Sequence, residues 1–276
     1  MTNKTIIGDQ SRVGFFNIDK IKELYYYKDL FYTLSWREFR VRYAQTFLGF
    51  AWAFLQPLAT LFIFFFVFGK AIKVDTGNIP YPVFALTGLT AWSYFSFVVS
   101  NAGKSIINEG AMIKKIYFPR LVIPLSKALV GLIDFGISFL LLIIAMIYFR
   151  VPITSNIIWL PVFIILILLA SLGLGIWISA LTIRFRDVQH IIPFFIQIGL
   201  YATPVAYSSQ MIPQKYFMAY FLLNPLAGVI EGFRWSIIGG NINLQYVLFD
   251  VVIILLLFTS SLIYFRKVER VMADIL

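Results

Sequence analysis

Long uncharged hydrophobic runs alternate with short polar segments along this chain. A helix needs about 20 mostly apolar residues to cross the ~30 Å hydrocarbon core of a bilayer. Six runs match or approach this length, at residues 50–69, 81–103, 121–149, 157–183, 188–206 and 244–265. The pattern predicts an all-α polytopic membrane protein with six transmembrane helices. The third run is long enough to tilt or project from the bilayer, and the short fifth run contains Pro193 and Pro204.

The composition supports a membrane protein. Hydrophobic residues make up 60% of the 276 residues and charged residues only 13%, against roughly 45–50% and ~25% in soluble domains. A soluble fold of this size could not bury so much apolar surface. A soluble enzyme, a disordered chain and a collagen-like fibre are therefore excluded. The absence of Cys also excludes disulfides, thiolate zinc sites and iron–sulfur clusters.

The net charge of +10 reflects membrane topology. Of the 23 Lys and Arg residues, 17 fall in the segments before span one, between spans two and three, between spans four and five, and after span six. Five lie on the opposite side. The positive-inside rule places the basic side in the cytoplasm, with both termini there. The charge therefore does not indicate nucleic-acid binding.

The first 49 residues lack the short apolar stretch of a signal peptide and show helical periodicity instead. Aromatic and aliphatic side chains recur on one face, and charged side chains fall on the other. The apolar positions are Ile21, Leu24, Tyr25, Tyr32, Trp36, Phe39 and Tyr43. This basic and aromatic pattern predicts an amphipathic helix lying in the membrane interface. The alternative is a cytosolic cap on the helix bundle.

Residues 104–120 form the largest internal cytoplasmic segment, too long for a simple turn. The segment mixes apolar and charged side chains, which suits docking into a partner's groove; the alternative is a loop that follows the bilayer surface. The candidate docking residues are Asn108, Glu109, Met112, Ile113, Lys114 and Lys115.

The outer segment 207–243 is too apolar for a free loop. Pro213 and the Asn224–Pro225 pair each precede an apolar stretch and are typical helix starts. Two short helices are predicted, which re-enter the outer leaflet because neither can cross it. Glu231 and Arg234 are three residues apart and so placed to form an ion pair.

Two charges and several aromatic residues fall within the predicted spans. Lys127 and Asp134 are seven residues apart, so they share a face of the third span. A structural pair or network is favoured, and the alternative is a role in lining a path. Tyr and Trp inside a passage can stack on sugar rings. The candidates for this role are Trp52, Trp92, Tyr94, Trp177 and Tyr201.

The sequence contains no complete phosphate-binding loop and no His pair for a catalytic metal site. The Gly103–Lys104–Ser105 stretch resembles the end of a phosphate-binding loop, but Val98 stands where the first Gly is required. The single His190 has no His partner for a catalytic metal site. Gly173 and Gly175 are better explained by close helix packing. The sequence therefore predicts a transporter or scaffold, with no metal and no cofactor in this chain.

Three segments resemble a known family, the permease subunits of ABC-type polysaccharide exporters, which include O-antigen (Wzm-type), capsule and teichoic-acid exporters. They are RVRYAQTFLGFAWAFLQP at 40–57, IKKIYFPRLVIPL at 113–125 and RFRDVQHIIPFFIQIGLYATPVAY at 184–207. The resemblance covers roughly residues 36–270. It implies a homodimeric permease in the bacterial inner membrane, with two separate subunits that bind ATP and Mg. Its substrate would be a lipid-linked glycan.

The same resemblance assigns roles to residues. Segment 1–49 would contain a gate helix, segment 50–265 the permease domain and segment 266–276 a cytoplasmic tail. The segment around 108–115 would be the coupling helix that docks on the ATPase. Arg37, Arg40, Arg42 and Tyr43 would receive the pyrophosphate of the substrate; ordinary lipid-headgroup binding is the alternative. The outer gate would comprise Pro213, Tyr216, Tyr220, Asn224, Pro225, Glu231 and Arg234.

Two rival functions stay open. An ABC-type drug or small-lipid exporter permease would share the six-span plan, although the aromatic content favours glycan. A membrane-embedded glycan-processing enzyme would need buried acid–base pairs, which the sequence does not show.

Overall fold

The structure, a computed structural model, describes residues 25–44, 49–270 and 272. The described residues form helices joined by short loops and contain no strand. The α-helices are α2 (Lys28–Ala44), α3 (Trp52–Phe64), α4 (Tyr81–Asn108), α5 (Gly110–Ile113), α6 (Val122–Phe149), α7 (Leu160–Arg184), α8 (Val188–Ala202), α9 (Phe217–Leu223), α10 (Leu226–Ile238) and α11 (Leu244–Glu269). A π-helical stretch, Phe65–Ala71, continues α3.

Five helical segments are long and apolar enough to cross a membrane. They are Gly49–Ala71, Tyr81–Asn108, Val122–Phe149, Ser155–Arg184 and Leu244–Glu269. The fifth predicted span is shorter: α8 has 15 residues, about 22 Å of helix. It ends because Thr203 is extended, as residues before proline prefer. The all-α membrane fold is thus confirmed, with five full-length spans, the short α8 and the bent α9–α10 pair.

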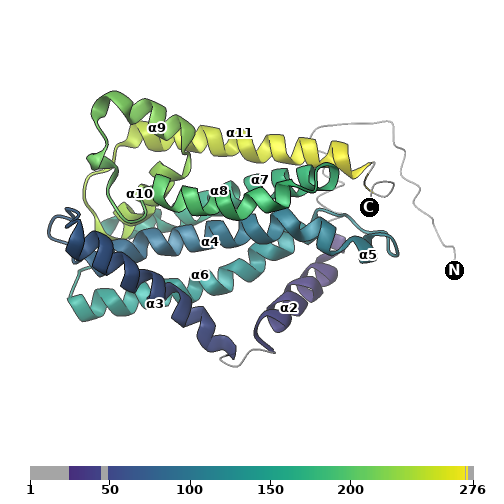
Figure 1. The fold of residues 1–276 in the computed structure, drawn as a ribbon, viewed down its shortest axis with the longest axis horizontal. Coiled ribbons are helices and arrows are strands. Elements are labelled where there is room, and N and C mark those ends of the chain that lie inside the picture. Colours follow the sequence, from purple (N-terminus) through teal and green to yellow (C-terminus); the bar gives the residue numbers. More distant parts are fainter. Residues whose placement is uncertain (1–24, 45–48, 271, 273–276) are drawn as a thin grey trace.

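The chain runs back and forth along the bundle between two ends (Figure 1). One end holds α5, the start of α2 and the end of α11, and is called the α5 end. The other holds α9 and α10 and is called the α10 end. The axes of the helical segments Gln214–Leu223 and Leu226–Ile238 are bent by 102°. This arrangement confirms the two short helices predicted in segment 207–243.

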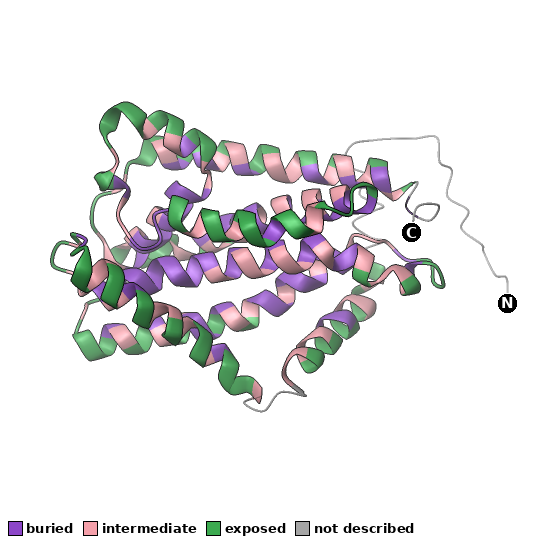
Figure 2. Ribbon diagram, in the orientation of Figure 1, coloured by how far each residue is buried: buried purple, intermediate pink, exposed green. Residues whose placement is uncertain are grey.

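Helix α4 is the centre of the fold, buried along most of its length between α6 and α7 (Figure 2). Small residues allow this packing. A Cβ on Gly175 of α7 would lie 2.9 Å from the Cβ of Ala102. The hydroxyl of Thr182 donates to the carbonyl of Gly103 at 3.0 Å. Close backbone approach through small residues, with hydroxyls bonding across helices, is how membrane helices associate.

Helices α3 and α8 are the most exposed of the apolar helices (Figure 2). Only Ala53 and Phe64 of α3 and Ile192 of α8 are buried. Large apolar side chains cover the rest, including Phe62 at 64% exposure and Phe194 at 64%. An apolar exposed face suits lipid or another membrane protein.

Candidate functional site

Helix α2 is bound to α6 by charged side chains within the bundle. The ammonium of Lys127 donates to a carboxylate oxygen of Glu38 at 2.6 Å. Asp134 accepts from the guanidinium of Arg42 and from the Tyr43 hydroxyl, the latter at 2.6 Å. Lys127 and Asp134 therefore belong to a network, but each pairs with α2 and they do not pair with each other.

The buried face of α2 differs from the predicted apolar face. Leu34 and Ser35 are buried against the bundle, whereas Tyr32 and Trp36 are about 60% exposed. The exposed aromatic face suits a helix that lies in the membrane interface. Ile21 and Leu24, predicted for the same face, lie outside the described residues.

Three arginines predicted to bind pyrophosphate have different environments. Arg37 forms an ion pair with Glu109, and Arg42 pairs with Asp134 while its guanidinium lies 4.5 Å from the Phe97 ring centroid. Arg40 is exposed and forms no ion pair with any described residue. In this conformation Arg40 is therefore the arginine whose five donors are open to a phosphate.

We expect Asp134→Leu to destabilise α2 more than Arg42→Met combined with Asp134→Leu. Loss of Asp134 alone leaves a partly buried guanidinium unpaired, whereas the double change removes both charges. The expected coupling energy is about 1–3 kcal/mol. Hydrogen exchange of residues 28–44 in the four proteins of this double-mutant cycle measures it. Additive effects would show that the pair does not hold α2.

The predicted coupling segment, residues 104–120, contains less loop than expected, because its first five residues belong to α4. Helix α4 continues through Lys104–Asn108, because an amphipathic run extends its helical pattern beyond the membrane. The four-residue α5 follows. Ile113 is buried and anchors the segment, while Lys114 and Lys115 are exposed beside Tyr117. Asn108 is exposed, Met112 is half-buried, and Glu109 pairs with Arg37 as described.

At the α10 end, Arg234 is a buried anchor between three elements. Its guanidinium donates to the Thr87 hydroxyl of α4 at 3.1 Å and to the carbonyls of Pro204 and Val205 at 2.8 and 3.1 Å. It also lies 3.8 Å from the ring centroid of Phe84. These hydrogen bonds tie α10 to α4 and to the segment after α8.

The predicted ion pair between Glu231 and Arg234 is wrong. Arg234 points into the bundle and is 6% exposed, whereas Glu231 accepts a hydrogen bond from the backbone N–H of Ser209 at 2.7 Å. Although the two residues are neighbours on α10, the donors of Arg234 are taken by Thr87 and by two backbone carbonyls. Glu231 instead fixes the short helical turn Ser209–Met211.

Two predicted gate residues, Tyr220 and Asn224, donate hydrogen bonds at the end of α8, together with Tyr207, which was not predicted. The hydroxyls of Tyr207 and Tyr220 donate to the Ala202 carbonyl at 3.0 and 2.8 Å. Asn224 donates to the Thr203 hydroxyl at 3.0 Å. Burial raises the pKa of the Tyr207 phenol. A helix end needs such partners, and here they come from residues 207–224, the segment that contains α9.

Pro213, Tyr216 and Pro225 begin or border the short helices. Pro213 accepts from the Tyr216 N–H at 2.9 Å and precedes the turn Gln214–Tyr216. Pro225 is the N-cap of α10.

Asp250 was not predicted as a site residue, yet it is fully buried on α11. One carboxylate oxygen accepts from the Gly228 N–H in the first turn of α10, at 2.7 Å. The partial positive charge of a helix N-terminus favours a carboxylate there. The sequence could have identified Asp250, because it is a single charged residue within a hydrophobic run, and charged residues inside membrane spans usually have a partner.

Gly88 permits the close approach around Arg234. A Cβ there would lie 2.5 Å from the Val205 carbonyl and 2.9 Å from the Arg234 guanidinium. We expect Gly88→Ala to destabilise the protein by roughly 1–3 kcal/mol through overpacking.

Gly136 on α6 is the matched control, because nothing lies within 4 Å of its added Cβ. Thermal unfolding in detergent, followed by gel filtration, compares the two variants. Equal stability of Gly88→Ala and Gly136→Ala would contradict the close packing at Gly88.

The five predicted passage aromatics divide into two groups. Trp92, Tyr94 and Trp177 pack within this chain: Trp92 lies against Gly199, Tyr94 donates to the Ala128 carbonyl at 3.3 Å, and Trp177 stacks on Tyr264 with centroids 4.5 Å apart. Trp52 and Tyr201 are 50% and 57% exposed, on α3 and α8. A lining role stays a prediction, best supported for Trp52 and Tyr201.

These helices, with an exposed basic segment at one end and a bent helix pair at the other, define a multi-pass membrane permease. Comparison with known families identifies which family of permeases this is: the family model for ABC-2 type transporters matches residues 29–238. The chain belongs to the ABC-2 type transporter family, whose members are transport permeases.

Curated relatives align with three quarters or more of this chain. The O-antigen export system permease protein RfbA of Klebsiella pneumoniae is 30% identical over 252 residues, which are 91% of this chain and 96% of the relative. The protein of the same name from Myxococcus xanthus is 31% identical over 216 residues, covering 78% and 82%. The polysialic acid transport protein KpsM of Escherichia coli is 28% identical over 211 residues, covering 75% and 80%.

Proposed function

We propose that this chain is the permease subunit of an ATP-driven exporter that moves lipid-linked polysaccharide across the bacterial inner membrane. The observation that supports this most strongly is the similarity to O-antigen export permeases over 91% of this chain. Two of the three named relatives are O-antigen permeases and the third transports polysialic acid. Polysaccharide is the substrate class that they share.

The proposed assembly has two copies of this chain and two ATP-binding subunits. The exposed apolar faces of α3 and α8 are the surfaces we assign to the second copy, with Trp52 and Tyr201 facing the passage between copies. ATP and Mg would bind on the partner subunits. The cytoplasm would lie at the α5 end, because most of the basic residues fall there.

The proposed coupling route begins at α5. Lys114, Lys115 and Tyr117 are exposed for docking, and Glu109 beside them is paired with Arg37 of α2. Movement of α5 by the ATPase would therefore act directly on α2. Through Lys127 and Asp134, α2 is attached to the transmembrane bundle. The same movement would reorient α2, whose exposed Arg40 we assign to the pyrophosphate of the substrate.

A strain lacking the gene tests the proposal. Surface polysaccharide, stained with a lectin or antiserum, is expected to disappear, and lipid-linked glycan is expected to accumulate inside the cell. The wild-type gene on a plasmid should restore the surface signal. Normal surface glycan together with increased sensitivity to a drug or altered lipid export would instead support a drug or small-lipid exporter.

A further inference from the structure

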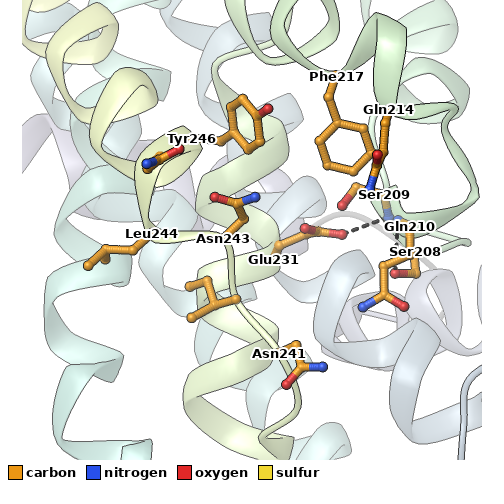
Figure 3. A pocket seen from close by; sticks show the side chains of 12 residues that line it. Ser208, Ser209, Gln210, Gln214, Phe217, Glu231, Asn241, Asn243, Leu244 and Tyr246 are labelled. Atoms are coloured by element: carbon orange, nitrogen blue, oxygen red, sulfur yellow. Dashed lines mark hydrogen bonds between the residues drawn. The ribbon is translucent and has the colours of Figure 1, made fainter.

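A polar cavity opens at the α10 end (Figure 3). Its volume is about 620 Å³, within the roughly 300–1,000 Å³ typical of small-ligand sites. Two segments face each other across it: residues 208–217, which end at the first residue of α9, and residues 241–246 at the start of α11. Glu231 of α10 lies between them.

Five side-chain amides line this cavity and leave their hydrogen-bonding groups open. They are Gln210, Gln214, Asn241, Asn243 and Gln245. None of these carboxamides makes a hydrogen bond with any residue that the structure describes. A carboxamide offers both two donors and an acceptor. It therefore matches a sugar hydroxyl, which also donates and accepts.

Aromatic rings complete the lining. Phe217 and Tyr246 both contribute to the wall, with ring centroids 5.4 Å apart. Tyr246 also stacks on the buried Phe221 at 4.8 Å, which holds its ring in place. An aromatic surface beside amide groups suits the C–H face and the hydroxyl edge of a pyranose at the same time.

The charge of the cavity restricts its ligand. Glu231 is the one formally charged side chain among the described residues that line it. One of its oxygens accepts from the Ser209 N–H at 2.7 Å. Lys215 is near in sequence but does not line it. Because no Lys or Arg among the described residues lines the cavity, the Glu231 carboxylate repels acidic sugars there and accepts bonds from hydroxyl or amino groups.

We propose that this cavity binds a neutral or amino-sugar residue of the glycan as it leaves the passage, and disfavours acidic sugars. The proposal rests on the function proposed above, because that function supplies the ligand class. The site would hold the emerging chain at the exit while the next residues pass. It would also select among polymers by charge.

The test measures binding of glycan to the full chain in lipid nanodiscs. The probe is soluble glycan released by mild acid hydrolysis from the surface polysaccharide of the producing strain, titrated by saturation-transfer NMR. Asn243→Ala combined with Gln245→Ala should weaken binding at least tenfold, because both exposed side chains contact only the ligand. Asn78→Ala, an exposed Asn on another loop, should stay within twofold of the wild type.

A second probe tests the charge selection. Oxidation of the primary hydroxyls of the same glycan to carboxylates should weaken binding at least tenfold, and Glu231→Gln should reduce that difference. Equal binding by the double variant and the wild type, or tighter binding of the oxidised glycan, overturns the proposal. A deletion strain that keeps its surface glycan refutes the export function instead, so the two failures are distinguishable.

Discussion

Replacing Arg234 with methionine is expected to destabilise the protein severely and to abolish export. The change removes the donors to the carbonyls of Pro204 and Val205, which are buried. An unsatisfied buried group costs about 1–3 kcal/mol, so the loss is expected to exceed about 2 kcal/mol. Thermal unfolding in detergent and the amount of protein in the membrane measure the effect.

Two further variants identify the cause. Arg234→Lys keeps a charge but lacks the planar fork that reaches several acceptors, so it should recover only part of the stability. Lys215→Met removes an exposed cation at the same end and should change stability little. If Arg234→Met were as stable as Lys215→Met, the anchoring role of Arg234 would be rejected.

The second large effect is expected from Lys114→Glu combined with Lys115→Glu. Both side chains are exposed beside α5, and reversal of their charges should weaken docking to the ATPase. Export is expected to fall at least tenfold while the permease still folds. ATPase activity of the reconstituted complex should no longer respond to substrate.

A matched control makes the same change of charge at the α10 end, the end of the bundle opposite α5. Lys73→Glu combined with Lys215→Glu alters two exposed lysines near the α10 end, and export should remain near normal. Similar loss of export in both double variants would indicate an effect of net charge, and docking at α5 would be disproved.

Local sequence patterns predicted most of the fold. The length and apolar character of each run identified the spans, and Pro213 and Pro225 marked the short helices. The end of α4 was misplaced because a charged residue, Lys104, does not by itself stop a helix. The fifth span was also overestimated, since its apolar run continues after the helix ends at Ala202.

Contacts between residues far apart in the sequence could not be predicted from these local patterns. Arg42 and Asp134 are 92 residues apart, and nothing in a single sequence specifies that pairing. Arg234 resembled a surface residue because a favourable partner, Glu231, stood three positions away. Its real acceptors include backbone carbonyls exposed by the end of α8, which no side-chain pattern reveals.

ATP-dependent transport in reconstituted vesicles tests the central claim most directly. Vesicles containing this chain and its ATP-binding partner would receive lipid-linked glycan on the face where ATP is supplied. ATP is expected to move the glycan to the other face, where a lectin detects it, whereas vesicles with the Lys114→Glu/Lys115→Glu variant should show no such transfer. Glycan that stays on its original face, with wild-type protein and active ATPase, would contradict the account.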